Sequence, residues 1–326
     1  MNRRRLDGGT GECAASRNSS WLAVALGGVI ALAGFGGHAF AQDAGDAAKG
    51  KATACVDPII SCGCTITKKG VYHVTKDLNS TQPLTPAGNC LEVKASNVVL
   101  DLEAHAITGP GVAAANNNTG IYINAGSPYL TLTGGSPTGG TSLISGWSVG
   151  VGSDSNLGTI SDIETDLNDV GIELLHSTSN NVTFWGAYDN IDVGLWVRQG
   201  QKNYIAYGDA GNSISPATQK VGILVGCGAT ATAAGVNCSG KSAGKSVQNN
   251  IQYAYVNDNT FYGIALDTNA TGNVVISIQG VSNITDDLFD SNAACDSNDW
   301  LNNIAGDSTA TPPIVGKNSP ACTLND

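Results

Sequence analysis

The sequence predicts an all-β solenoid, in which short strands from successive coils stack into parallel sheets. The first observation is a glycine-led tetrad that occurs six times, at residues 120–123, 150–153, 171–174, 194–197, 222–225 and 263–266. Successive glycines are 30, 21, 23, 28 and 41 residues apart, so the repeat has a base length in the low twenties with insertions. A unit this short cannot bury its own apolar face, whereas stacked units can.

The second observation is a hydrophobic column within the tetrads. The residue after the glycine is Ile121, Val151, Ile172, Leu195, Ile223 or Ile264. Two positions later the residue is again apolar, with Ser153 as the exception, and the position between is mixed. Alternation with a period of two indicates a strand with one buried face. We therefore expect the aliphatic columns to point into the solenoid and the mixed column to point outward.

The third observation is a second strand in each coil, which opens with asparagine. These strands begin at Asn181, Asn203, Asn250 and Asn273. Asparagine tolerates left-handed backbone and turns, so we expect stacked asparagines at the corners of the coils. The pattern leaves the register of these strands open, because Ile205 and Tyr207 could equally be an inward pair.

Composition and repeats together indicate one elongated domain. The chain has 326 residues, 42 of them glycine, with 13% charged and 6% aromatic residues, which suits short strands and turns. We expect the coils to span residues 97–285, after a flexible start at 42–54 and an N-terminal cap at 55–96. Residues 286–326 would close the solenoid, because an open end exposes apolar surface and unpaired strand edges.

Residues 1–41 are predicted to be a secretory signal peptide, removed on export to the periplasm or the medium. Four arginines precede an apolar run at residues 21–35, and Ala39-Phe40-Ala41 forms a cleavage site. Cleavage leaves 12 basic and 25 acidic residues, a net charge of −13, and Arg198 as the only arginine. We expect such a surface to bind neither nucleic acid nor anionic membranes, and no membrane span remains. Polyuronates would be repelled unless a divalent cation bridged them.

An even number of cysteines remains after the expected cleavage, which predicts disulfides in an exported protein. Cys227 and Cys238 would close an inserted loop, and Cys295 and Cys322 would hold the C-terminal segment. An N-terminal set comprises Cys55, Cys62, Cys64 and Cys90. Cys62 and Cys64 are too close to pair with each other, which leaves two connectivities open. We expect no metal site at these cysteines.

Residues 97–109, with the sequence NVVLDLEAHAITG, resemble the opening coil of right-handed parallel β-helix proteins of the pectin-lyase-like superfamily. The later repeats resemble those of the same group, and residues 289–300 with Cys322 are similar to the close of exported bacterial β-helix proteins of unassigned function. The resemblance covers residues 55–326 and implies a single-stranded right-handed parallel β-helix, in agreement with the handedness of parallel crossovers. This architecture hosts lyases, hydrolases, epimerases and non-enzymes alike.

The catalytic motifs of that superfamily are missing from this sequence. Lyase chemistry of the pectate type uses an arginine or lysine base beside calcium-binding carboxylates, and the arginine-bearing motifs are absent. The carboxylate series of the polygalacturonases and the aspartate-and-histidine signature of the alginate epimerases are also absent. We therefore expect a protein without catalytic activity, although an atypical site remains an alternative.

Two groups of outward residues are candidates for a binding site. In the tetrad strand, Glu173 should lie beside Trp196 at about 4.8 Å, with Arg198 one step along. This patch could bind a sugar, but we favour Trp196 packing under the inserted loop. With His176 and Asp192, Glu173 and Arg198 would form the atypical catalytic site. In the second strand, Trp185 and Tyr207 could form an outward aromatic pair near Tyr188.

Both stacking on a glycan and packing inside the protein are open for these aromatic residues. The recurring pairs Asp189-Asn190 and Asp258-Asn259 suggest either a calcium ladder or an asparagine-lined turn, and we favour the turn. No cofactor other than calcium is suggested.

Three functions compete. The preferred hypothesis is an exported β-helix that binds a polysaccharide or another cell-envelope or extracellular component. The second is a polysaccharide lyase, hydrolase or epimerase with an atypical site, and the third is a structural or adhesive module.

Overall fold

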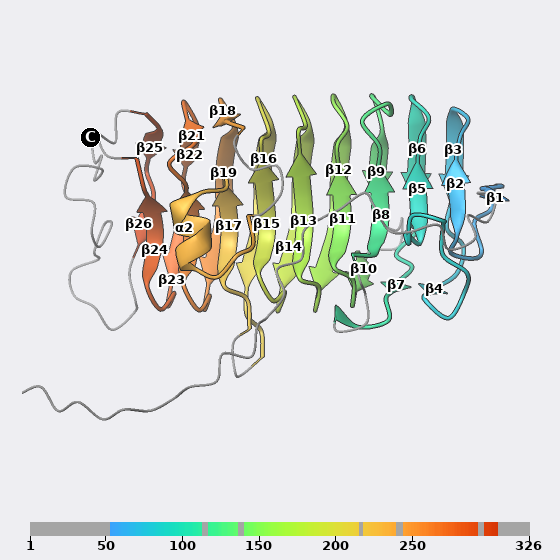
Figure 1. The fold of residues 1–326 in the computed structure, drawn as a ribbon, viewed down its shortest axis with the longest axis horizontal. Helices are drawn as coiled ribbons and strands as arrows, with labels where there is room; N and C mark the ends of the chain where they lie inside the picture. The colour runs from blue at the N-terminus through green and yellow to red at the C-terminus, as the bar shows by residue number, and fades with distance from the viewer. Residues whose placement is uncertain are drawn as a thin grey trace, which may run out of the picture. The chain divides into compact units, whose positions relative to one another are not determined.

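The computed structural model describes residues 53–112, 117–135, 140–214, 218–238, 244–292 and 297–305, all within one compact unit that spans Gly37–Asp326. These residues form the predicted single-stranded right-handed parallel β-helix, with the strands of successive coils side by side (Figure 1). The expected signal peptide lies outside the described residues. No helix in the described part of the chain is long and apolar enough to cross a membrane.

The first sheet has ten parallel strands. In spatial order they are β1 (Thr53–Ala54), β2 (Cys64–Ile66), β5 (Leu91–Val93), β8 (Thr119–Ile123), β11 (Val149–Ser153), β13 (Val170–Leu175), β15 (Val193–Arg198), β17 (Val221–Val225), β20 (Tyr262–Leu266) and β24 (Asp286–Asp290). All six glycine-led tetrads lie in this sheet. Its strands begin before residue 97 and continue beyond residue 285.

The inward column of this sheet is confirmed. Ile172 pairs with Leu195, which pairs with Ile223, which pairs with Ile264. Each of these side chains is fully buried. Stacked aliphatic side chains therefore form one continuous core along the coils, as expected for a solenoid whose units cannot fold singly.

The second sheet has 14 parallel strands and supplies two faces of each coil. Its longest members are β12 (Thr159–Asp166), β14 (Asn181–Tyr188), β16 (Tyr204–Gly211) and β19 (Asn250–Asn257). The shorter members are β3 (Gly70–His73), β4 (Leu78–Asn79), β6 (Val98–Asp101), β7 (Ile107–Thr108), β9 (Thr131–Thr133), β10 (Ser142–Ser145), β22 (Val274–Ile276), β23 (Gln279–Val281), β25 (Asp299–Leu301) and β26 (Ile304–Ala305). A two-stranded sheet, β18 (Ser246–Val247) and β21 (Ala270–Thr271), and the short helix α2 (Ala229–Ala233) complete the described elements.

Each long strand of the second sheet bends at one residue with left-handed backbone. These residues are Asp162, Phe184, Tyr207 and Tyr253, with φ values of 57°, 53°, 55° and 53°. The bend breaks the alternation of the strand, because two residues instead of one separate the inward positions before and after it. In β14, Val182 and Trp185 are both buried although they are three residues apart.

The bend settles the open register and corrects one expectation. Ile205 is fully buried, whereas Tyr207 is 48% exposed. Trp185 is not the outward partner of Tyr207: its side chain is 3% exposed and lies in the core. A strict two-residue alternation would place Trp185 outside, and the left-handed residue before it reverses that placement. The indole needs space from the next coil, where a Cβ atom on Gly208 would lie 1.9 Å from its Cε2 atom.

Two ladders of amide side chains, nearly all of them buried, connect the coils at their corners. The first consists of Asn180, Asn203, Asn249, Asn273 and Asn298, and the second of Asn168, Asn190, Gln219, Asn259 and Asn283. The asparagine-lined turn expected at Asn190 and Asn259 is therefore present. The corner asparagines expected in two coils, Asn181 and Asn250, are not the ladder residues. The ladder uses the asparagine directly before each of them.

Each ladder amide satisfies groups on both neighbouring coils. The Nδ2 atom of Asn203 donates to Oδ1 of Asn249 at 3.0 Å and to the carbonyl of Ser177 at 3.3 Å. Its Oδ1 atom accepts from the backbone N–H of Asn180 at 3.0 Å and from Nδ2 of Asn180 at 3.2 Å. Buried polar groups without such partners would cost free energy, so the ladders fix the position of each coil against the next.

Three disulfides lie in the described part of the chain. Cys227 is bonded to Cys238, as expected. The N-terminal set is paired as Cys55–Cys64 and Cys62–Cys90, which resolves the two connectivities left open by the sequence. Cys295 and Cys322 lie outside the described residues.

Replacement of Asn203 by leucine tests the role of the ladder. Asn203→Leu keeps a side chain of similar size but leaves the backbone N–H of Asn180 and the carbonyl of Ser177 buried without these partners. We expect the free energy of unfolding to fall by about 2–4 kcal/mol, measured by urea denaturation followed by circular dichroism. Asn181→Ala, at the exposed neighbouring position, is the control and should change it by less than about 0.5 kcal/mol. Equal midpoints for the two variants would contradict the role of the ladder.

Candidate functional site

The most developed exposed surface belongs to the outward side chains of four neighbouring strands after their bends. We call it the β12–β19 face. It comprises Asp162, Glu164 and Asp166 on β12; Phe184, Gly186 and Tyr188 on β14; Tyr207, Asp209 and Gly211 on β16; and Tyr253, Tyr255 and Asn257 on β19. The pairing of the four strands places corresponding residues beside each other.

An aromatic ridge runs along one edge of this face. The rings of Phe184 and Tyr207 have centroids 5.3 Å apart and an interplanar angle of 12°, and those of Tyr207 and Tyr253 are 5.3 Å apart at 8°. Their side chains are 59%, 48% and 49% exposed. The ridge arises because the bend residue recurs once per coil, and the coil spacing of about 4.8 Å suits ring stacking.

Carboxylates and tyrosines fill the centre of the face. Glu164 and Asp209 occupy the same column on either side of Gly186, which puts their Cα atoms about 9.6 Å apart. The ring of Tyr188 lies over Gly186, where a Cβ atom would be 2.7 Å from its Cε2 atom. Tyr188 also hydrogen-bonds to Asp209, and burial raises the pKa of both groups.

Asp166 has the most perturbed carboxyl group of this face. Burial, together with the negative charges of Asp189 and Glu164, raises the pKa of Asp166 to about 6, against a hydrogen bond from the backbone of Leu167. Asp189 itself accepts hydrogen bonds from the backbone N–H groups of Ser213 at 2.9 Å and Ile214 at 3.2 Å, and from the Ser213 hydroxyl. Asp166 and Asp209 each have a buried carboxylate oxygen, Oδ1, that has no hydrogen-bond partner among the described residues.

The charged residues on the strands of the second sheet are all acidic, apart from a histidine on β3. None of its 14 strands contains a lysine or an arginine. Aspartate or glutamate residues occur on β6, β12, β16 and β25. The β12–β19 face is therefore a region of negative potential.

The patch predicted on the first sheet has the expected register but is buried. Glu173 pairs with Trp196 and Trp196 with Leu224, while Arg198 pairs with Leu175. The exposed fractions of Glu173, Trp196 and Arg198 are only 6%, 3% and 3%. The favoured interpretation, packing of Trp196 under the inserted loop, agrees with this arrangement.

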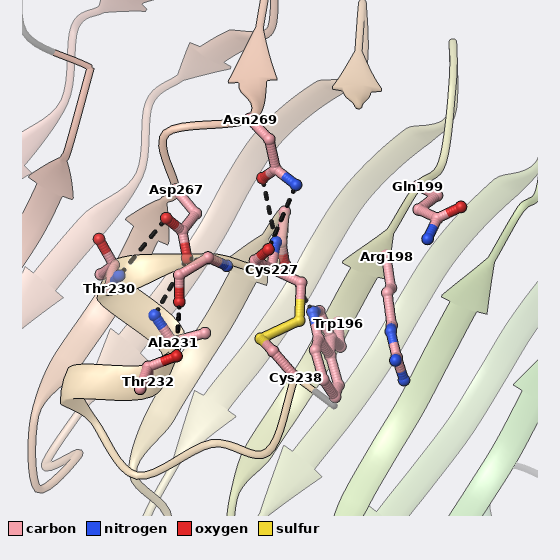
Figure 2. Close-up of a disulfide and its surroundings, with 12 residues drawn as sticks. Trp196, Arg198, Gln199, Cys227, Thr230, Ala231, Thr232, Cys238, Asp267 and Asn269 are labelled. Atoms are coloured by element: carbon pink, nitrogen blue, oxygen red, sulfur yellow. Dashed lines mark hydrogen bonds between the residues drawn. A yellow bond between two sulfur atoms is a disulfide. The ribbon is translucent and has the colours of Figure 1, made fainter. Parts of the chain in front are cut away.

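The insertion between β17 and β18 covers this part of the first sheet. Helix α2 and the Cys227–Cys238 disulfide pack with outward residues of the sheet in a second hydrophobic cluster (Figure 2 shows Trp196 beside the disulfide). The carboxylate of Asp267 holds the insertion by accepting from the backbone N–H groups of Gly228 at 2.6 Å and Ala231 at 3.0 Å. Asn269 both accepts from and donates to the backbone of Cys227 (Figure 2).

Beneath this cover, Arg198 forms an ion pair with Glu173. Its Nη1 atom lies 3.4 Å from Oε1 of Glu173, and its guanidinium lies 5.0 Å from the ring centroid of Trp196. Burial raises the pKa of Glu173, while the charge of Arg198 opposes this shift. The Nε1 atom of Trp196 donates to the carbonyl of Gly226 at 2.8 Å, so all three side chains take part in packing.

The structure does not gather the four catalytic candidates into one site. Glu173 and Arg198 are together, and His176 is half-exposed with its Nδ1 atom 4.0 Å from Asp154. Asp192 precedes β15, whereas Arg198 ends it, so the two are about 20 Å apart along the strand. Asp192 is paired instead with Nζ of Lys220 at 2.6 Å.

Several residues of the β12–β19 face could have been found from the sequence. Each ridge residue lies four positions after a ladder asparagine, as in Asn180 and Phe184, or Asn249 and Tyr253. Alignment on the true ladder would have revealed the ridge. Glu164, Asp166 and Asp209 have no comparable signal. Within the described residues, no group of three His, Cys, Asp or Glu side chains could hold a metal ion, and calcium binding stays a prediction.

Asp166→Asn should make stability less dependent on pH. Because the folded-state pKa of about 6 exceeds the ordinary value of 3.8, the folded state binds the proton more tightly. The stabilisation of the folded state by this proton is complete at pH values below the ordinary pKa of 3.8, and it is lost as the pH rises through 6. We therefore expect Asp166→Asn to raise the thermal midpoint relative to the wild type at pH 7–8, with the difference shrinking towards pH 4. Thermal melts at these pH values measure it, and a difference independent of pH would contradict the assignment.

Comparison with known proteins concerns the fold. No protein-family model and no curated protein sequence matches the chain. Among solved structures, it is similar to the enzymatically active domain of tailspike protein 2 from bacteriophage CBA120, with 17% identity and a TM-score of 0.53 over 75% of this chain and 36% of that one. The periplasmic alginate epimerase AlgG has 15% identity and a TM-score of 0.46, over 75% of this chain and 56% of that one. Pectate lyase Pel9A has 15% identity and a TM-score of 0.40, over 76% of this chain and 60% of that one.

The chain thus spans between about one third and three fifths of these three structures. The likeness to the tailspike domain and the observed strand order lead to one conclusion: the protein has the parallel β-helix fold.

Proposed function

We propose that this protein is an exported β-helix without catalytic activity that binds a glycan on the β12–β19 face. The observation that carries the proposal is the ridge of Phe184, Tyr207 and Tyr253, three exposed rings on successive coils. A soluble protein surface rarely keeps contiguous aromatic side chains exposed without a use for them. The proposal rests on this face and not on the likeness to solved structures, because one fold hosts many functions.

The chemistry of the face suits a sugar chain. A pyranose has apolar C–H surfaces, which pack on aromatic side chains, and hydroxyl groups, which donate to carboxylates. The ridge supplies the apolar surface, and Glu164, Asp209 and Tyr188 supply hydrogen-bonding groups beside it. Because the ridge repeats an aromatic ring on three successive coils, the face matches a ligand that is itself a repeating polymer.

Export accords with the covalent chemistry of the chain. The described residues contain three disulfides, and such bonds persist mainly in oxidising compartments. Together with the signal peptide predicted from the sequence, they support a ligand in the periplasm, the cell envelope or the surrounding medium. An adhesive module would use the same face, with binding as its whole function.

Loss of the central ring should weaken glycan binding. Tyr207→Ala removes the middle of the ridge and leaves the inward side chains untouched. We expect affinity for the best-bound member of a panel of neutral and charged polysaccharides to fall roughly five- to tenfold, measured by calorimetry or affinity electrophoresis. Tyr129→Ala removes a tyrosine that is 57% exposed elsewhere on the solenoid and should bind as the wild type does. If both variants bind equally well, the ridge is not the binding site.

A glycoside hydrolase is the second candidate, and one observation favours it. Asp166, with a pKa of about 6, would hold its proton at mildly acidic pH, as a general acid must, and Glu164 and Asp209 are carboxylates on the same face. A lyase or epimerase at Glu173 and Arg198 would instead require the insertion to move, because both residues are buried beneath it.

A reducing-end assay on the same polysaccharide panel separates binding from hydrolysis. The proposed function predicts no release of reducing ends by the wild type. Release that decreases as the pH rises above about 6, and that Asp166→Asn reduces by about 100-fold or more, would establish the hydrolase and refute the proposal of a non-catalytic protein.

A further inference from the structure

The charge of the β12–β19 face restricts the kind of glycan that it suits. Two coils contribute Asp162, Glu164, Asp166 and Asp209 to its outward surface, and no lysine or arginine occurs on any strand of the sheet. A polyuronate brought to this face would set its carboxylates against these groups, and like charges in proximity repel.

Cationic side chains near the face do not neutralise it. Lys220 lies beyond the corner formed by the second ladder, where its Nζ atom contacts Asp192 at 2.6 Å and the carbonyl of Gly235 at 3.0 Å. Lys202 lies at the opposite corner, exposed and directly before Asn203. The positive charge that would complement the face must therefore come largely from a ligand.

The aromatic ridge restricts the kind of ligand that could supply this positive charge. Ammonium groups are attracted to carboxylates and to the faces of aromatic rings, and aromatic rings also pack on the C–H groups of sugars. A sugar with a free amino group offers both features in one residue. A neutral sugar offers only the apolar surface and hydroxyl groups.

From this combination we infer that the ligand of the β12–β19 face is an amino-sugar polymer whose free amino groups carry positive charge. The inference rests on the proposed glycan-binding function and names its ligand class. In the bound state, the sugar rings lie along Phe184, Tyr207 and Tyr253, and the ammonium groups lie over the column of Glu164 and Asp209. A polycationic peptide is the competing occupant, but it lacks a pyranose to pack along the ridge.

The test compares oligosaccharides that carry positive, zero and negative charge. Binding of a glucosamine oligomer, its fully N-acetylated counterpart and an oligogalacturonate to the mature protein is measured by calorimetry, at low ionic strength and at a pH where the amines are protonated. We expect the glucosamine oligomer to bind at least roughly tenfold more tightly than the acetylated oligomer, and the oligogalacturonate not to bind. Added salt should reduce the difference.

Two variants connect the preference to the face. Glu164→Gln keeps the shape of the side chain and removes its charge, so it should weaken binding of the glucosamine oligomer several-fold and leave the acetylated oligomer unaffected. Glu103→Gln, outside the face, is the matched control and should change neither. Tyr207→Ala should weaken both oligomers by similar factors, because both use the ridge.

The outcomes distinguish the inference about the ligand class from the proposal that the face binds a glycan. Equal binding of the two oligomers, both weakened by Tyr207→Ala, would overturn the inference and leave glycan binding in place. Absence of binding to these oligomers and to the whole polysaccharide panel would overturn the proposed function itself. Polylysine that binds as tightly as the glucosamine oligomer and is insensitive to Tyr207→Ala would show a general polycation surface and also overturn the inference.

Discussion

Hydrogen bonds between buried amide side chains of successive coils set the register on which the rest of this solenoid depends. Strand pairing alone leaves a repeat free to slip, because a parallel sheet offers the same backbone groups at every position. A ladder asparagine such as Asn203 removes this freedom, since its amide must meet an amide above, an amide below and a carbonyl of the preceding coil. A slip by one residue would leave several polar groups buried without partners, at a cost of a few kcal/mol per coil.

The fixed corners make the backbone bend recur at the same place in β12, β14, β16 and β19, and this bend shapes both the core and the candidate site. Left-handed backbone at Phe184 turns Trp185 into the interior, where Gly208 of the next coil leaves room for the indole. The same conformation directs Phe184 outward onto Tyr207. Such backbone is unfavourable for residues with side chains, and stacking of the rings across coils offsets part of this cost. Packing inside and recognition outside therefore depend on the same residue positions.

The sequence predicted what repeats and missed what does not. Ile172, Leu195 and Ile223 were identified as an inward column because a two-residue alternation is a local property of the strand. The side on which Trp185 lies was left open, because a single left-handed residue, invisible to a hydrophobicity pattern, shifts the alternation. The neighbours of Glu173 and Trp196 were also predictable from the repeat. Their burial was not fully decided, because it depends on how a non-repeating insertion folds back over the sheet. The cysteine pairing likewise required the positions of β2 and β5 in space.

The insertion has a consequence for where a ligand can bind. By covering Trp196 and the Glu173–Arg198 pair, it converts a polar, aromatic part of the first sheet into a second hydrophobic cluster. A buried ion pair is expensive to desolvate and is retained only where its geometry is good or its removal would leave one charge alone. The guanidinium over the ring of Trp196 meets that condition. Opening the insertion would expose this cluster and release Asp267 from the backbone of Gly228 and Ala231, so binding there must compete with several favourable contacts. The β12–β19 face has no such cover among the described residues, and its aromatic and acidic groups meet a ligand without prior rearrangement.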